Sequence, residues 1–204
     1  YSNTYAPLER LRQLYEEALS HPQVVGIVIG TRPDCVDESK LDYLASLARG
    51  EAMPDWSRTI NGHERRSPIV IVEYGIESCY DQTLVRINRG HDFATAERAV
   101  QMTTERGLAC GAHFILGLPG ETDEMMLEGV KAINRLNLTT VKFHQLQVFR
   151  DTAMALEFDK HPDRFRFWTV DAYIDLVVEL LRRLRPDVVV ERFASEAPPR
   201  YHYG

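Results

Sequence analysis

Two short apolar runs, each ending in a glycine turn and separated by helical sequence, constrain the fold of this chain most. The first run covers residues 72–78 (VEYGIES), and the second covers 113–122 (HFILGLPGET). Strands that end in glycine turns present backbone polar groups where a ligand can lie. One such junction would mean little, but two of them at this spacing predict a repeated β/α architecture.

The rest of the chain alternates strand and helix patterns with little sequence between them. Apolar runs typical of buried strands cover 24–29, 69–72, 112–116, 141–149 and 188–192, and amphipathic patterns typical of helices cover 8–18, 41–48, 81–106 and 168–184. Gly90 is expected to divide the stretch 81–106 into two helices, and Thr122 to cap another. A polar segment at 50–67 is expected to be a mobile loop. This order predicts an α/β fold, a parallel sheet or partial (β/α) barrel with right-handed crossovers.

Composition sets the class of protein. With 204 residues, 44% of them hydrophobic, the chain is long enough for one domain over 1–204. The net charge of −6 disfavours a broad nucleic-acid footprint but leaves a local RNA-binding patch open. No apolar run approaches the roughly 18 residues of a membrane span, and no signal segment opens the chain, so we expect a cytoplasmic protein without membrane contact.

The cysteines predict no metal site within the chain. Cys35, Cys79 and Cys110 are odd in number and widely spaced, which fits neither a disulfide framework nor a zinc site. Each is expected to be an ordinary small apolar residue. We therefore expect no metal ligand among them.

Four segments occur in the order seen in radical S-adenosylmethionine (SAM) proteins. They are 30–34 (GTRPD), 72–81 (VEYGIESCYD), 88–91 (NRGH) and 117–121 (GLPGE). The chain resembles the branch that contains the elongator catalytic subunit and uncharacterised bacterial radical SAM Fe-S oxidoreductases, over nearly its whole length. The resemblance implies a partial barrel that binds SAM and a [4Fe-4S] cluster, and an enzyme that reductively cleaves SAM to start radical chemistry on an unknown substrate.

The CxxxCxxC motif that holds the cluster in this family is absent. The matching segments place Tyr1 near the end of the family's second strand. By the resemblance, the chain is the C-terminal portion of a radical SAM domain, truncated at its N-terminal side, and lacks the first strand and the cluster-binding loop. The cluster ligands would then lie upstream, and we expect the chain alone to be catalytically inactive.

The resemblance also assigns cofactor-binding residues. Glu73, with Gly75 beside it, would contact the ribose or amino-acid group of SAM, although a barrel acid paired with a base is the alternative. Ser78 would bind the SAM carboxylate or simply end the turn. Arg89 would grip that carboxylate through two hydrogen bonds, with Arg86 as the alternative partner.

The second glycine turn would form the adenine side of the SAM site. Gly117 and Pro119 would bring backbone close to the ring, and Glu121 would either contact the cofactor or favour the N-terminus of the next helix. Relatives commonly have Gln where Glu77 stands. Because Glu77 carries a negative charge that Gln lacks, the contact that it makes with SAM is left open.

Three strand residues are expected on the substrate side, and no catalytic residue is assigned. They are His113, His144 and Gln145, for which a hydrogen-bonded core position is the alternative. If the strand alternates regularly, His144 shares a face with Lys142. Arg32 and Asp34 are expected to form a structural pair.

Two other functions remain open at this point. The first is a non-catalytic β/α-barrel scaffold that binds RNA, SAM or a protein, and the second is a non-radical β/α-barrel enzyme with phosphate-type binding at its glycine turns. A complete gene without CxxxCxxC would favour the scaffold, and lack of SAM affinity would favour the non-radical enzyme. SAM is the expected small-molecule partner, and RNA is one candidate substrate. The sequence does not indicate the oligomeric state.

Overall fold

A five-stranded parallel sheet organises the computed structural model, which describes residues 3–52, 59–60, 63–64 and 67–203. In sheet order, the strands are β1 (Gly26–Thr31), β4 (Ile69–Glu77), β5 (Ala109–Leu116), β6 (Thr140–Gln145) and β7 (Val189–Arg192). The predicted α/β fold with a parallel sheet is confirmed. A separate antiparallel pair, β2 (Thr59–Ile60) and β3 (His63–Glu64), falls in the predicted mobile loop, of which 53–58, 61–62 and 65–66 lie outside the described residues.

Helices follow the strands in the order expected. They are α1 (Leu8–Ser20), α2 (Glu38–Ala48), α3 (Asp81–Arg86), α4 (Phe93–Glu105), α5 (Asp123–Arg135), α6 (Ala153–Lys160) and α7 (Val170–Arg183). Thr122 caps α5, since its hydroxyl oxygen accepts the Met125 N–H at 3.2 Å. Gly90 lies between α3 and α4 as predicted, with a positive φ of 88°. No helix in the described ranges is long and apolar enough to cross a membrane.

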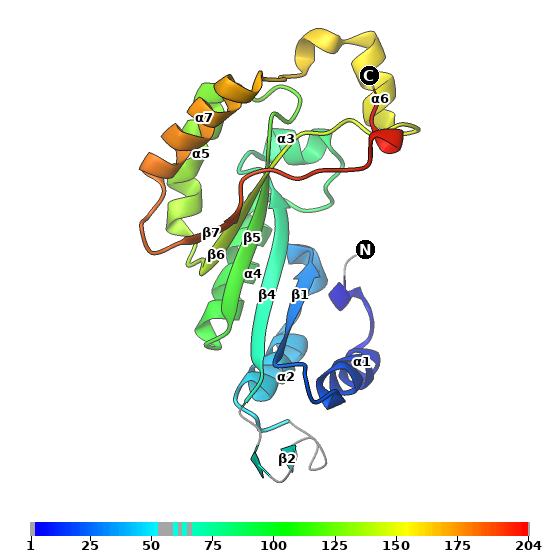
Figure 1. Cartoon of the computed structure of the whole chain (residues 1–204), viewed down its shortest axis with the longest axis vertical. Coiled ribbons are helices and arrows are strands. Elements are labelled where there is room, and N and C mark those ends of the chain that lie inside the picture. The colour runs from blue at the N-terminus through cyan, green and yellow to red at the C-terminus, as the bar shows by residue number, and fades with distance from the viewer. Residues whose placement is uncertain (1–2, 53–58, 61–62, 65–66, 204) are drawn as a thin grey trace. The chain divides into compact units, whose positions relative to one another are not determined.

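The chain divides into two compact units. Unit 1 comprises Tyr1–Gly75, Ala94–Ala112 and Asn137–Thr139, and unit 2 comprises Ile76–Phe93, His113–Leu136 and Thr140–Gly204. In unit 1, β1 and β4 pair in parallel from Gly26 opposite Ile69 to Thr31 opposite Tyr74 (Figure 1).

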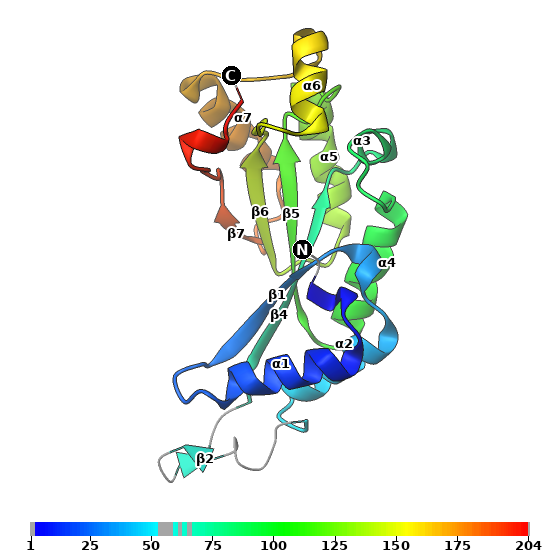
Figure 2. The same cartoon turned by 90° about the vertical axis from the view of Figure 1, so that its right-hand side faces the viewer.

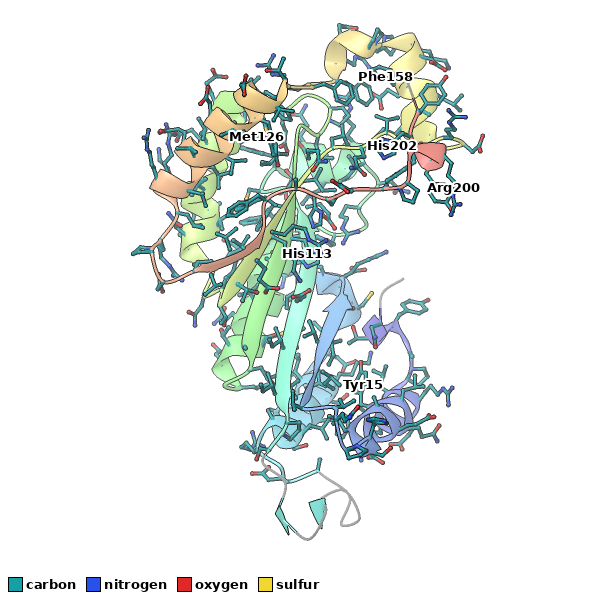
Figure 3. The ribbon with its side chains drawn as sticks, in the orientation of Figure 1. Tyr15, His113, Met126, Phe158, Arg200 and His202 are labelled. Carbon is teal, nitrogen blue, oxygen red and sulfur yellow. The ribbon has the colours of Figure 1, made fainter. Side chains whose placement is uncertain are left out.

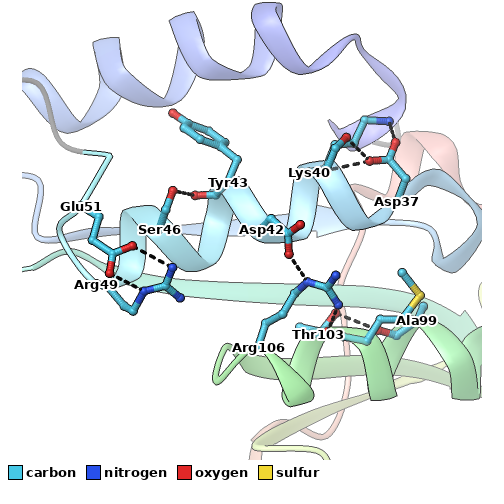
Figure 4. A network of polar contacts seen from close by, with 12 residues as sticks. Asp37, Lys40, Asp42, Tyr43, Ser46, Arg49, Glu51, Ala99, Thr103 and Arg106 are labelled. Carbon is cyan, nitrogen blue, oxygen red and sulfur yellow. Dashed lines mark hydrogen bonds and ion pairs between the residues drawn. The ribbon is translucent and has the colours of Figure 1, made fainter.

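In unit 1, polar contacts join helix α4 to helix α2 and to strand β4. Arg106, just after α4, donates from Nε to Asp42 of α2 at 2.6 Å (Figure 4). The Tyr74 hydroxyl lies 2.7 Å from the Thr103 hydroxyl and is fully buried. Because a buried hydroxyl without a partner is costly, this bond fixes α4 over the strand.

Unit 2 packs α5 and α7 side by side against one face of its strands (Figure 1), and β5 and β6 point the same way in Figure 2. Phe114 of β5 and Phe143 of β6 are buried together, with ring centroids 6.3 Å apart. Side chains alternate along a strand, so His113 and His144 project from the opposite face, where both are half-buried. The apolar face therefore meets the helices, and the histidine face does not.

The strand predicted over 141–149 ends earlier, at Gln145. Beyond it, Val148 and Arg150 pair with the last residues of the chain, through the Tyr203 N–H to the Val148 carbonyl and the Arg150 N–H to the Tyr201 carbonyl, both at 2.9 Å. Helix α6, which follows, was not predicted. Its Phe158, labelled in Figure 3, packs edge-on against Phe165, with the ring centroids 5.1 Å apart.

Candidate functional site

The end of β4 and the glycine turn after β5 are joined by a hydrogen bond. Ser78 donates from Oγ to Oε1 of Glu121 at 2.5 Å and accepts the Tyr80 N–H at 3.0 Å. Ser78 is 3% exposed and Glu121 7% exposed. Burial raises the pKa of the Glu121 carboxyl, and hydrogen bonds from Ser78 and Thr83 oppose that rise. Two segments 43 residues apart thus share one buried polar contact.

Glu77 occupies a strained position at this same edge. Its φ of 75° lies in the left-handed region, which costs a residue with a side chain about 1–2 kcal/mol. An Oε1 of Glu77 lies 3.2 Å from a guanidinium nitrogen of Arg89, and the two side chains are only 17% and 21% exposed. Burial raises the Glu77 pKa, and the charge of Arg89 opposes the rise. Glu77 therefore pairs with Arg89, the residue predicted to bind the SAM carboxylate.

Arg86, the alternative anchor, has other partners. Its guanidinium donates to the Pro119 carbonyl at 3.3 Å and pairs with Glu157 of α6. These contacts hold the glycine turn against α6. Of the two arginines, only Arg89 pairs with an acid at the end of β4.

The turn at 117–120 requires glycine at two positions. Gly117 has a φ of 86°, and a Cβ there would lie 2.8 Å from the ring of Trp168. Gly120 has a φ of 90°, and a Cβ there would lie 2.9 Å from a guanidinium nitrogen of Arg86. Trp168 is fixed in turn, because its indole Nε1 donates to Asp123 at 3.2 Å. The turn is tightly packed against the Trp168 ring, the Arg166 backbone carbonyl and the Arg86 side chain, all of the same unit.

Glu73 and Gly75 lie within β4 rather than after it. The predicted strand ended at 72, whereas β4 continues to Glu77 and pairs with β1 as far as Tyr74. Glu73 stands opposite Gly30 in this register and is 6% exposed. Both residues belong to unit 1. The strand continues past the acid because backbone pairing, rather than side-chain polarity, determines where it ends.

The two predicted histidines lie beside each other. His113 of β5, labelled in Figure 3, and His144 of β6 have ring centroids 5.6 Å apart. Burial lowers the pKa of His144, and the positive charges of His113, Arg192 and Lys142 lower it further. Sequence reasoning did not connect Arg192 with His144, because the two residues meet only when β6 pairs with β7.

Gln145 binds protein backbone. Its amide nitrogen donates to the Ser195 carbonyl at 2.6 Å, and its amide oxygen accepts the Ser195 N–H at 2.9 Å. Gln147 donates to the same carbonyl at 2.7 Å. The two amides together hold the segment that follows β7. This positioning contact was not visible in the sequence, since the partner lies about fifty residues further on.

The three cysteines do not form a metal site. Cys35 and Cys110 are buried, and burial raises the pKa of Cys110 to about 12. Cys79 is half-buried, and its Sγ donates to the Gly129 carbonyl at 3.6 Å. Across the described ranges, no group of three or more His, Cys, Asp or Glu side chains is placed to hold a metal ion. Arg32 and Asp34 form an ion pair with each other, as predicted.

Comparison with known protein families identifies two matches that together span most of the chain. The model described as the radical SAM superfamily matches residues 63–133, and the model described as the Radical_SAM C-terminal domain matches 138–202.

Curated relatives extend the similarity to nearly the full chain. The uncharacterized protein YtqA of Bacillus subtilis is 33% identical over 97% of this chain and 56% of its own length, so the chain spans little more than half of that relative. A tRNA uridine(34) acetyltransferase of Methanocaldococcus infernus is 29% identical over 58% of this chain and 18% of its own length. The solved structure of Elp3 from the same archaeon, with an N-terminal deletion, superimposes with a TM-score of 0.77 at 18% identity. It covers 98% of this chain and 47% of that one, and supports the fold.

Proposed function

The chain belongs to the radical SAM superfamily, and from this we propose that the whole protein is an enzyme that cleaves SAM reductively at a [4Fe-4S] cluster to start radical chemistry. The cluster and SAM supply chemistry that no side chain can. The chain's own part is to bind and orient SAM and the substrate.

The residues of this chain do not fit the cluster. Cys110 is buried in a strand with a raised thiol pKa, Cys79 points at a backbone carbonyl, and the described residues contain no three-ligand group. A cluster needs cysteine thiolates. We therefore propose that its ligands lie in the part of the relatives' length that this chain does not span, and that the chain alone cleaves no SAM.

The Ser78–Glu121 hydrogen bond is the observation that carries the proposed SAM site. It brings two of the family's motif segments together within one compact unit, beside the Glu77–Arg89 pair. Arg89 is proposed to bind the SAM carboxylate by exchanging Glu77 for it, since a guanidinium binds either carboxylate in the same geometry.

The remaining cofactor contact in unit 2 is proposed from backbone. Gly117 and Pro119 would lie on the adenine side of SAM, and the roles of Glu73 and Gly75, which belong to unit 1, stay predictions. Glu121 would position Ser78 in this site by accepting the hydrogen bond from its hydroxyl group. The cavity beside these two residues, about 30 Å³ in volume, has room for about one water, so SAM must lie outside it.

Anaerobic reconstitution of the full-length protein tests the proposal. With iron, sulfide, SAM and dithionite, it should form a reducible cluster and release 5′-deoxyadenosine, with and without tRNA as a trial substrate. Transfer RNA is included because of the similarity to a tRNA uridine(34) acetyltransferase. Arg89→Ala should weaken SAM binding, whereas Arg49→Ala, at an exposed residue that pairs with nearby Glu51, should not.

A fully reconstituted protein that releases no 5′-deoxyadenosine would overturn the enzyme proposal. SAM binding without cleavage would point to a scaffold instead. If Arg49→Ala also lost SAM cleavage, the effect of Arg89→Ala would be explained by destabilisation of the fold and not by a lost SAM contact.

A further inference from the structure

A β-turn at 118–121 forms the middle of the glycine turn that is proposed for the adenine side of SAM. The Glu121 N–H donates to the Leu118 carbonyl at 3.0 Å, and Gly120 has a φ of 90°. Proline at the second position and a positive φ at the third are typical of a type II turn. Type I and type II turns differ in the orientation of their central peptide group, which here joins Pro119 to Gly120.

Both ends of this peptide group are hydrogen-bonded to other segments of unit 2. Arg86 donates from Nη1 to the Pro119 carbonyl at 3.3 Å, and the Gly120 N–H donates to the Arg164 carbonyl at 3.2 Å. Nη1 of Arg86 also lies 2.9 Å from the position of a Cβ at Gly120, so the guanidinium fills the space that a side chain would take there. A flip of the peptide group would break both hydrogen bonds.

Glu157 of α6 fixes the guanidinium that holds this carbonyl. Helix α6 lies beyond the carboxyl ends of β5 and β6 (Figure 2). Oε1 of Glu157 accepts a hydrogen bond from Nη2 of Arg86 and lies 3.7 Å from Nη1 of Arg164. The hydrogen bond from Arg86 lowers the pKa of the Glu157 carboxyl, and the charge of Arg164 adds to that effect. Because a guanidinium is planar, the bond from Nη2 to Glu157 determines where Nη1 points.

The Arg86–Glu157 ion pair is better suited to orientation than to stability. The two side chains are 30% and 29% exposed, and an ion pair in contact with water contributes little to the free energy of unfolding. Leu118, which is 1% exposed, attaches the turn to α6 independently, because it packs in one buried cluster with Ala155 and Phe165. Removal of the Glu157 carboxylate should therefore leave the fold intact and free the guanidinium of Arg86.

We propose that Glu157 is a positioning residue for SAM, which acts through Arg86 to keep the central peptide group of the turn in its type II orientation. The inference rests on the proposed function, because it takes the glycine turn as the adenine side of the SAM site. A turn that is fixed before SAM arrives loses less conformational entropy on binding, which raises the affinity. In this role, Glu157 affects SAM only through the backbone of the turn.

Hydrogen–deuterium exchange of the full-length protein without SAM tests the effect on the turn. In Glu157→Ala, the amides of 117–121 should exchange about three- to tenfold faster, because the peptide group is no longer held at its carbonyl end. Glu157→Gln keeps an oxygen that accepts from Arg86 and should lie closer to wild type. Asp159→Ala is the matched control, since it removes an exposed acid of the same helix that accepts from the Tyr203 hydroxyl at 2.7 Å.

SAM affinity tests the effect on the site. Equilibrium dialysis of the reconstituted full-length protein should show about five- to tenfold weaker SAM binding in Glu157→Ala. Release of 5′-deoxyadenosine at saturating SAM should change by no more than about twofold, because positioning of the turn affects binding. Arg86→Ala should weaken SAM binding by a similar factor. The double variant should bind no more weakly than Arg86→Ala alone, because Glu157 acts through Arg86.

Several results would overturn the proposal. They are wild-type exchange at 117–121 in Glu157→Ala, wild-type SAM affinity in that variant, and a double variant whose loss is the product of the two single losses. An equal loss in Asp159→Ala would assign the effect to α6 as a whole and so contradict a specific role for Glu157. If the wild type binds SAM without cleaving it, the enzyme proposal fails, and the affinity comparison still decides this inference.

Discussion

Ser78 and Glu121 hold each other in a buried hydrogen bond, and Thr83 donates to the same carboxyl group. Replacement by Glu121→Ala leaves the two buried hydroxyls without this acceptor, which should cost about 1–3 kcal/mol of unfolding free energy. Chemical denaturation of the protein measures the loss. Glu124→Ala, on the first turn of α5, is the control; a loss of equal size there would contradict a specific role for the buried bond.

The raised pKa of Glu121 predicts a pH dependence of stability. The folded state binds the carboxyl proton more tightly than the unfolded state, so this group destabilises the fold as pH rises above its ordinary value of about 4.5. Glu121→Gln cannot ionise. Its stability relative to wild type should therefore increase as pH is raised from acid to neutral. A constant difference across that range would show that the carboxyl titrates normally.

Glu77→Gln should release Arg89 from its ion pair. A neutral amide competes less with the SAM carboxylate, so SAM affinity of the reconstituted full-length protein should rise by about three- to tenfold, for a gain of about 1 kcal/mol. Equilibrium dialysis measures it. Glu51→Gln, which alters the exposed pair with Arg49 instead, should leave the affinity unchanged. Weaker SAM binding in Glu77→Gln would indicate that the acid itself contacts the cofactor.

Gly117→Ala should destabilise the fold more than Gly107→Ala. Both glycines have a positive φ, but a methyl group at 107 meets nothing within 4 Å, whereas at 117 it would lie 2.8 Å from Trp168. The backbone strain of about 1–2 kcal/mol is common to both, and the clash is specific to 117. Thermal unfolding of the two variants gives the comparison. Equal losses would mean that the Trp168 ring and the Arg166 backbone carbonyl, 2.9 Å from the same Cβ position, both move aside freely.

Gln145 and Gln147 should protect the segment after β7 from proteolysis. Replacing both by Ala removes three hydrogen bonds to Ser195 and should speed trypsin cleavage at Arg192 and Arg200. Gln101→Ala, which loses a hydrogen bond to Glu105 on the surface of α4, is the matched control. Unchanged cleavage rates in the double variant would show that other contacts hold the segment.

The sequence predicted the order of strands and helices and the junctions that bear the motifs, because these depend on local pattern. It did not predict contacts set by distant partners. The run at 146–149 is apolar enough for a strand, yet it pairs with the last residues instead of continuing β6. Helix α6 has eight residues and a weakly amphipathic pattern, so periodicity gave little signal for it.

Site residues divide in the same way. Arg86 and Arg89 were both candidates for the SAM carboxylate, and Arg86 instead pairs with Glu157. No local sequence pattern relates Glu157 to either arginine. His113 and His144 were expected on the substrate side, and their closeness, with ring centroids 5.6 Å apart, was not predicted. The position of Arg192 opposite Lys142 was not predicted either, because it depends on an irregularity in the β6–β7 ladder. Gln145 looked like a ligand-facing polar residue, but its amide groups bind the backbone of Ser195. The predicted cofactor-binding roles of the motif residues stay predictions.

The pairing of Val148 and Arg150 with Tyr201 and Tyr203 has a consequence for synthesis. The two segments are about fifty residues apart, and their backbone groups cannot satisfy one another until both have left the ribosome. Until then the stretch after β6 exposes unpaired amides and apolar side chains. We expect unit 2 to complete its fold only after Tyr203 has emerged, and so later than unit 1, whose last segment is Asn137–Thr139.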